Sequence, residues 1–397
     1  MFHIFKVSTH HGHEEGRLFS YLSMLLGFTS AVFWAVLPSY VGLFSGNNIS
    51  LTLFFALIGV SSFAGALAST IIFRHFKRVL IFKVSLLIYS LIFALMVFVS
   101  NYGTLLVLEM IRNFVNVLIW IALALFVRDF SNENELGRSE GRFFLFINVG
   151  FILGFALSSI IMSFSSYNFN FYLASLVGII TFLYFSYQHV VYKNRINDKI
   201  ERTTVSDFFN NFKDYFKNIR RTKSFLTGFS LHYWLIMSAI FFPIFIELKG
   251  FSNSVVGYVL AASIIPLIFM EEWSGSKSDY SSMKYYLFLG FFFLSIISFW
   301  LGSNPSPILM IILMVISGFG VGIIEPLQEK HFFNITTKSE EEKFYGVRMT
   351  AQPLASIFAP LFATLTLGFF GLSGGWIITG IILLAACFVV LSFRKSI

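Results

Sequence analysis

The chain contains twelve apolar stretches that are each long enough to cross a lipid bilayer as a helix. About 20 helical residues span the roughly 30 Å hydrocarbon core of a bilayer, because each residue adds about 1.5 Å. Lipid offers no hydrogen bonds, so a spanning backbone must be helical or form a closed barrel, and the alternating ~10-residue strands of a barrel are not evident. The sequence therefore predicts an all-α polytopic membrane protein, with spans at approximately 18–44, 50–73, 79–100, 104–127, 143–163, 169–191, 225–246, 254–276, 284–302, 307–329, 348–370 and 374–393.

The placement of basic residues predicts which way the chain crosses the membrane. Of the 397 residues 56% are hydrophobic and 12% charged, whereas about a quarter of a soluble domain is charged. Only Lys249 of the 28 Lys and Arg lies in a connection opposite the N-terminus, and only Arg112 lies mid-span. This positive-inside bias predicts cytoplasmic termini. We expect the protein to lie in the cell membrane. The net charge of +8 thus orients the chain in the lipid bilayer and need not indicate nucleic acid.

The spans divide into two groups of six, separated by a basic segment. We expect an N-terminal bundle at 1–191, a cytoplasmic linker at 192–224 and a C-terminal bundle at 225–397. In the linker, apolar residues recur at three- and four-residue steps and share one helical face, opposite Lys and Arg. This pattern predicts an amphipathic helix in the inner membrane interface, which is compatible with a simple tether. The face comprises Val205, Phe208, Phe209, Phe212, Phe216 and Ile219.

The two groups of spans look like copies of one unit. The loop beginning at Ser69 after span two has a counterpart beginning at Gly275 after span eight. Gly141 at the start of span five has a counterpart in Gly346 at the start of span eleven, at nearly the same separation along the chain. Two landmarks with one offset indicate an internal duplication.

The loop after span two and its counterpart resemble a motif of the major facilitator superfamily of secondary transporters, Gly-x-x-x-Asp-Arg-x-Gly-Arg-Lys. The second copy keeps Gly275, Asp279 and Lys284. The first copy keeps Arg74, Lys77 and Arg78, while Ser69, Phe73 and Phe76 replace its Gly, Asp and Gly. The resemblance implies two six-helix bundles related by a pseudo-twofold axis, which open a central cavity alternately to either side.

Further residues support this resemblance. Arg112 in span four resembles an arginine of the proton-coupled drug exporters in that family. The fifth-span pattern of small residues remains as Gly150 and Gly154, and its counterpart in span eleven is Ala355, Ala359 and Pro360. Small residues four apart let helix backbones approach closely, so we expect spans five and eleven to slide against neighbours across the central cavity.

Charges at the cytoplasmic ends of the spans suggest an inner gate. Glu271 and Glu272 end span eight, close to the basic loops, and are expected to pair there with Lys277 or Lys284. A cation site is the alternative for these carboxylates. The loop charges, with Asp279 among them, also serve equally well as topology determinants.

Ionisable groups deep in the membrane are the strongest functional candidates, because each costs about 2.5–3.5 kcal/mol to insert. Glu109 and Arg112 are three residues apart on span four and can pair. With Asn113 and Asn116 they form a candidate substrate or proton site, and a static ion pair that locks helices together is the alternative. Glu325, followed by Pro326 in span ten, is the preferred proton-carrying group, unless it is an acid that reaches out to the inner interface.

The sequence therefore predicts a secondary transporter of a small molecule, coupled to protons. The direction of transport is open, with Arg112 and the aromatic surroundings favouring export of amphipathic compounds. A facilitator or importer of a small polar solute is the alternative, followed by a membrane scaffold or enzyme. Phosphate loops, nucleophile elbows and paired metal-binding motifs are absent from the sequence. We therefore expect no enzyme activity, cofactor or metal. We also expect the protein to be a monomer.

Overall fold

The computed structural model describes residues 12–130, 136–191, 205–277, 280–371 and 373–393, apart from certain side chains within these ranges. The regular structure of these residues is α-helical. The first half contains α1 (Gly12–Trp34), α2 (Leu37–Ser45), α3 (Asn48–His75), α4 (Arg78–Met96), α5 (Tyr102–Phe130), α6 (Leu136–Phe164) and α7 (Tyr167–Val191). The second half follows the linker helix α8 (Val205–Phe216) and contains α9 (Ile219–Leu248), α10 (Asn253–Lys277), α11 (Tyr280–Gly302), α12 (Pro307–Ile335), α13 (Lys338–Arg348), α14 (Ala351–Phe370) and α15 (Ser373–Leu391).

Twelve segments of these helices are long and apolar enough to span a membrane, which confirms the predicted number of spans. The first span runs from Leu18 to Ser45 and contains both α1 and α2. Pro38 lies in the first turn of α2, where a missing backbone N–H costs least, and the helix is interrupted just before it. The eleventh span, Lys343–Leu367, likewise includes the end of α13 and most of α14.

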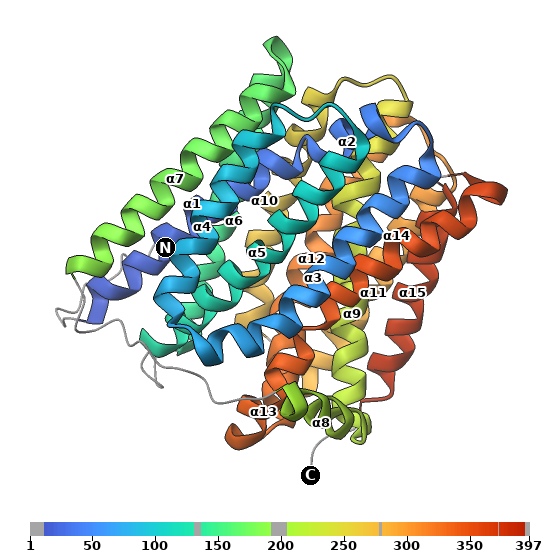
Figure 1. Ribbon diagram of the computed structural model, residues 1–397. Helices are drawn as coiled ribbons and strands as arrows, with labels where there is room; N and C mark the ends of the chain where they lie inside the picture. Colours follow the sequence, from blue (N-terminus) through green and yellow to red (C-terminus); the bar gives the residue numbers. More distant parts are fainter. Residues whose placement is uncertain (1–11, 131–135, 192–204, 278–279, 372, 394–397) are drawn as a thin grey trace, which may run out of the picture.

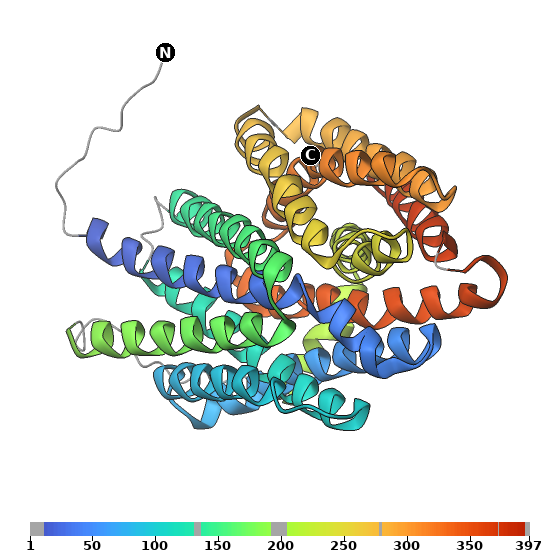
Figure 2. The ribbon, with the colours of Figure 1, turned by 90° about the horizontal axis from the view of Figure 1, so that it is seen from above.

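The helices pack as two bundles that meet along two helix pairs. Within the first half α1 packs on α6 and α4 on α7, while within the second half α9 packs on α14 and α11 on α15. Across the halves, α3 packs on α14 and α6 on α10 (Figures 1 and 2). If spans two and five correspond to spans eight and eleven, a twofold axis converts the first of these cross-half pairs into the second. The contacts therefore fit the predicted duplication.

The bundle has two ends, the terminal face and the loop face. The terminal face holds the start of α1 and the end of α15, and the loop face holds the α2–α3 and α9–α10 connections. The linker helix α8 lies at the terminal face, next to α13 (Figure 1).

The seventh span begins earlier than the sequence predicted. The side chain of Asn218 accepts a hydrogen bond from the backbone N–H of Arg220 at 2.9 Å, which caps α9. The helix therefore starts at Ile219 rather than 225, and the basic residues Arg220, Arg221 and Lys223 belong to α9.

Part of the predicted apolar face of the linker helix contacts protein, whereas Phe209 and Ile219 of that face are exposed. Tyr215 is buried in a cluster with Phe225 of α9 and Phe344 of α13, and Phe212 and Phe216 pack against it. The neighbouring helices α13 and α9 cover the part of this face at Phe212 and Phe216. The placement of the helix in the inner membrane interface stays a prediction.

Ion pairs fix α8 on α13, and we predict that this contact does not change between pH 5 and pH 8. Hydrogen bonds from Lys343 at 2.8 Å and Lys217 at 2.9 Å lower the pKa of Asp214 to about 2. A carboxyl group whose pKa is lowered by folding contributes above its ordinary pKa, and the contribution is lost only as the pH falls through the lowered value. Hydrogen exchange of the α8 amides, corrected for the intrinsic rate, should therefore show constant protection across that range. A change in the corrected protection between pH 5 and pH 8 would contradict this assignment.

Candidate functional site

Glu109 and Arg112 form a bidentate ion pair inside the first half. Arg112 donates from Nε to Glu109 Oε2 at 2.6 Å and from Nη2 to Oε1 at 2.5 Å, and both side chains are fully buried. The guanidinium lies 4.4 Å from the ring centroid of Phe33 on α1, with Tyr89 and Phe93 of α4 also close. The pair thus joins α5 to α1 and α4, and in this conformation no solvent reaches it.

The two asparagines that accompany this pair in the sequence lie differently. Asn113 donates to the carbonyl of Ile58 at 2.9 Å and to the hydroxyl of Ser62, so it ties α5 to α3 within the same half. Asn116 is half-buried. The structure does not gather Asn113 and Arg112 around one point, because they face different helices.

Glu325 and Glu271 form a carboxyl pair in the second half, which the sequence had divided between two sites. The two side chains, on α12 and α10, lie within hydrogen-bonding distance of each other. Asn148 of α6 donates from Nδ2 to Glu271 Oε2 at 3.2 Å, from the other half of the molecule. Within the described residues, the contacts of these carboxyls include no Lys, Arg or His. Two carboxyl groups can lie this close when they share a proton, because the shared proton removes the repulsion between two negative charges.

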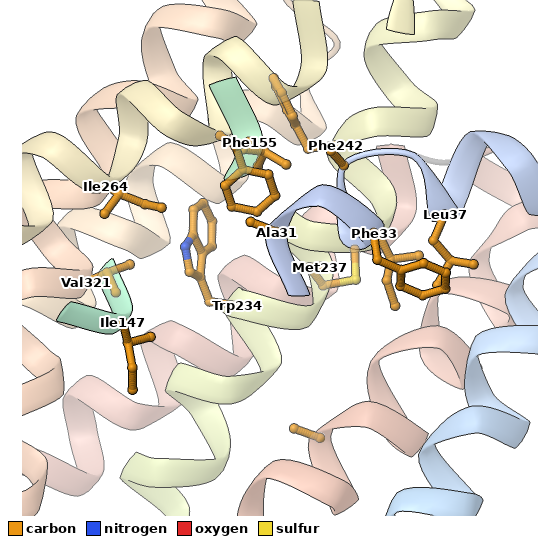
Figure 3. Close-up of a cluster of buried hydrophobic side chains, with 14 of the residues drawn as sticks. Ala31, Phe33, Leu37, Ile147, Phe155, Trp234, Met237, Phe242, Ile264 and Val321 are labelled. Carbon is orange, nitrogen blue, oxygen red and sulfur yellow. The ribbon is translucent and has the colours of Figure 1, made fainter. Parts of the chain in front are cut away.

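Apolar side chains fill the centre of the molecule beside this carboxyl pair. Figure 3 shows Trp234 of α9 beside Ile147 of α6 and Val321 of α12, and Trp234 is 1% exposed. Ile147 directly precedes Asn148, and Val321 lies one helical turn before Glu325. The carboxyl pair therefore borders an apolar, aromatic region between the two halves.

Lys284 is bonded to the end of α15 rather than to Glu271. Its Nζ donates to the backbone carbonyls of Leu391 and Phe393, at 3.2 Å for Phe393. It thereby caps the end of α15, where helix carbonyls lack intrahelical partners. This corrects the expected contact of Lys284 with Glu271, which pairs with Glu325 instead.

The remaining residues of the predicted inner gate are only partly covered by the structure. Arg78, at the start of α4, is buried, and Lys77 is exposed. Asp279 and the side-chain surroundings of Arg74, Glu272, Gly275 and Lys277 lie outside the described part of the chain. The gate assignment of these residues stays a prediction.

The small residues of span five face a helix of their own half. A Cβ on Gly150 would meet the backbone N of Phe28 at 2.9 Å, and one on Gly154 would meet the carbonyl O of Phe28 at 2.5 Å. Both contacts are with α1, so these glycines bring α6 against α1. The motif correctly indicated close approach, but the partner is not across the central cavity.

The small residues of span eleven share a buried face of α14. Ala355 and Ala359 are fully buried, and Pro360 lies inside the helix. Ala351 and Ala363, on the same face, lie against Gly228 of α9 and Gly375 of α15. This face therefore packs within the second half, whereas the backbone at Ser356 approaches α3 across the halves.

The sequence interpretation missed two polar contacts near the carboxyl pair. Asn148 had no distinguishing pattern, since a lone amide in a span is also compatible with helix packing. Glu329 pairs with the buried Arg348 at the end of α13. An unmatched arginine at the start of span eleven is a sequence signal that would have suggested a carboxylate partner.

Comparisons with known proteins agree with this architecture. The family model of the Major Facilitator Superfamily matches residues 19–328 and again residues 237–396. No curated protein matches the chain at a significant level. The solved structure of the nucleoside transporter NupG, in a mutant form, superposes with a TM-score of 0.73 and 13% identity, covering 96% of this chain and 100% of that one.

Two structures of a POT family transporter are also similar. One is in complex with 5-aminolevulinic acid (TM-score 0.76, 11% identity) and one with a thioalcohol-conjugated peptide (TM-score 0.76, 10% identity). Each match covers 95% of this chain and 95% of the other. At such identities the likeness shows a shared fold and leaves the substrate open. The family match over the whole length, with twelve spans in two bundles, shows that this chain is a membrane transporter of the Major Facilitator Superfamily.

Proposed function

We propose that the protein is a proton-coupled transporter that opens alternately to the two sides of the membrane, and that Glu271 and Glu325 carry the proton. The observation that supports this proposal is the hydrogen bond from Asn148, in one half, to the carboxyl pair in the other. Repulsion between two ionised carboxylates is strong where water is scarce, so their proton count changes their mutual geometry. A change in geometry at Glu271 acts directly on a contact that joins the halves.

The Glu109–Arg112 pair has a different part in this proposal. It is already neutralised, and it lies among α1, α4 and α5 of one half. We therefore assign it to holding the first bundle together, so that this bundle moves as a rigid unit.

The substrate that we propose is a small amphipathic molecule. The apolar residues around Trp234 suit an apolar body, and the neighbouring carboxyl pair and Asn148 suit a polar group. One chain supplies both halves and the site between them, so we propose that a monomer is sufficient. The basic residues on the terminal face favour its orientation to the cytoplasm of a cell membrane.

The proton assignment predicts that Glu325→Gln removes the pH dependence of the conformational equilibrium. One coupled proton changes the ratio of the two conformations by up to about tenfold per pH unit. Spin labels at Ser45 of the first half and Ser252 of the second, both near the loop face, report this ratio through their distance distribution. The wild-type distribution should shift between pH 5 and pH 8, and that of Glu325→Gln should not.

A matched control separates loss of the proton site from loss of any carboxylate. A backbone hydrogen bond from Thr337 lowers the pKa of Glu340 on α13, so Glu340 stays ionised over this range. Glu340→Gln should therefore keep the wild-type pH slope. An unchanged slope in Glu325→Gln would show that the carboxyl pair does not carry the coupled proton.

The substrate and direction can be tested in proteoliposomes with an imposed pH gradient. If the protein exports amphipathic compounds, these compounds should cross the membrane in the direction opposite to the flow of protons down the imposed gradient. Uptake of a small polar solute, independent of that gradient, would instead support a facilitator.

A further inference from the structure

Four polar side chains join the two halves at the loop face, far from the carboxyl pair. Ser39 of α2 donates a hydrogen bond to Glu247 of α9, and Asn253 of α10 donates one to the hydroxyl of Tyr167 of α7. Each bond crosses from one half to the other. Tyr167 also lies near enough to Glu247 for the two to interact electrostatically, so these residues form one group, the loop-face cluster.

The loop-face cluster stands at the opposite end of α10 from the carboxyl pair. Asn253 is the first residue of α10, whereas Glu271 lies near its other end. The backbones of the two halves also approach closely on this side. A Cβ on Gly257, one helical turn after Asn253, would meet the carbonyl O of Phe155 on α6 at 2.6 Å. The structure is therefore closed at the loop face.

We propose that Tyr167 and Glu247 are gate residues, whose hydrogen bonds hold the loop face closed and break each time the transporter opens to that side. The inference rests on the alternating access proposed above. It is independent of which group carries the proton.

The chemistry of the cluster suits a reversible gate. Glu247 is half-buried, and its partner is a neutral hydroxyl. When the halves separate at this face, water can replace each lost partner, so the net cost of breaking such a bond is moderate. The fully buried Glu109–Arg112 pair contrasts with this, because breaking it would leave two charges without partners.

Two tyrosines provide a matched test. The rings of Tyr40 and Tyr167 lie 5.4 Å apart, and each hydroxyl makes one hydrogen bond in the described structure. Tyr40 donates to the carbonyl of Met96 at 3.0 Å, within its own half, whereas Tyr167 is bonded across the halves. Replacing either with phenylalanine removes one hydroxyl at the same face, and only Tyr167→Phe removes a link between halves.

The experiment measures the distance between spin labels at Ser45 and Ser252, with the buried Cys387 replaced by alanine. Tyr167→Phe should raise the ratio of loop-face-open to closed molecules by about threefold to tenfold, the effect of one lost hydrogen bond. Tyr40→Phe should leave this ratio unchanged. Ser39→Ala should act like Tyr167→Phe, while Ser39→Thr, which keeps a hydroxyl, should restore the closed state.

Equal distance distributions for Tyr167→Phe and Tyr40→Phe, whether both closed or both opened, would overturn the gate assignment. If Tyr167→Phe fails to fold, the Ser39→Ala and Ser39→Thr pair decides the question in the same way. Failure of the proton assignment has a different signature, since it concerns the pH slope of Glu325→Gln and not the ratio at one pH.

Discussion

Replacing Arg112 with alanine should lower the free energy of unfolding by about 3–5 kcal/mol, because it leaves the carboxylate of Glu109 buried without its partner. Both side chains are fully buried, and the guanidinium makes two hydrogen bonds to the carboxylate. The truncation also removes the contact of the guanidinium with the ring of Phe33. Unfolding in mixed micelles, followed by tryptophan fluorescence, measures this loss.

An exposed ion pair provides the control for this measurement. Lys217 and Asp214 pair at 2.9 Å, but their side chains are 64% and 37% exposed. Lys217→Ala should leave the free energy of unfolding nearly unchanged, because water screens such a pair. If Arg112→Ala is as stable as Lys217→Ala, the pair at Arg112 does not hold the first bundle together.

A double replacement separates the structural role of Arg112 from a role in transport. Glu109→Leu combined with Arg112→Met removes both charges and keeps most of the volume, so most of the stability should return. If the pair only locks helices, this double variant should also transport. A stable double variant without transport would instead assign the pair to the substrate or proton path.

The fold could be predicted from the sequence because its main determinants are local. A span is recognised from about 20 consecutive residues, so twelve spans could be predicted without any knowledge of tertiary contacts. The start of α9 at Ile219 was missed for the same reason. A polar helical extension beyond the membrane has no hydropathy signal, and its cap, Asn218, resembles any loop asparagine.

The carboxyl site could be predicted only in part, because it depends on how helices rotate about their axes. Glu325 was identified from the cost of an acid in the membrane. Glu271 was placed at the gate because it lies near a helix end, and its contact with Glu325 depends on the relative rotation of α10 and α12. No local pattern fixes that rotation. The same limit explains Gly150, where close approach was correctly predicted but the partner helix was not.

Substitution of Gly59, which no sequence motif had indicated, should change the conformational equilibrium of the protein more than substitution of Gly150 does. A Cβ on Gly59 would meet the carbonyl O of Ser356 at 2.6 Å and the backbone N of Ile357 at 2.7 Å, across the α3–α14 contact between the halves. Backbone atoms cannot rotate away as a side chain can. Gly59→Val should therefore cost about 1–3 kcal/mol in the conformation described here.

The two glycines differ in how this strain can be relieved. At Gly59 the halves can separate as rigid bodies, a movement that the alternating access proposed above requires, so Gly59→Val should favour conformations in which α3 and α14 lie apart. The ratio of conformations, measured between labels at Ser45 and Ser252, should change by about fivefold to a hundredfold, since 1.4 kcal/mol corresponds to a factor of ten. Stability against unfolding should fall much less.

At Gly150 the obstructing backbone belongs to α1 of the same half, and α1 cannot move without repacking that bundle. Gly150→Val should therefore lower the free energy of unfolding by about 1–3 kcal/mol or more, with little change in the label distance. If both variants unfold with the same loss and neither changes the distance, then the contact between α3 and α14 does not separate in the cycle. The two halves would then have to rotate about an axis that passes through Gly59. Only a contact on the rotation axis, here that between α3 and α14, stays intact while the halves rotate.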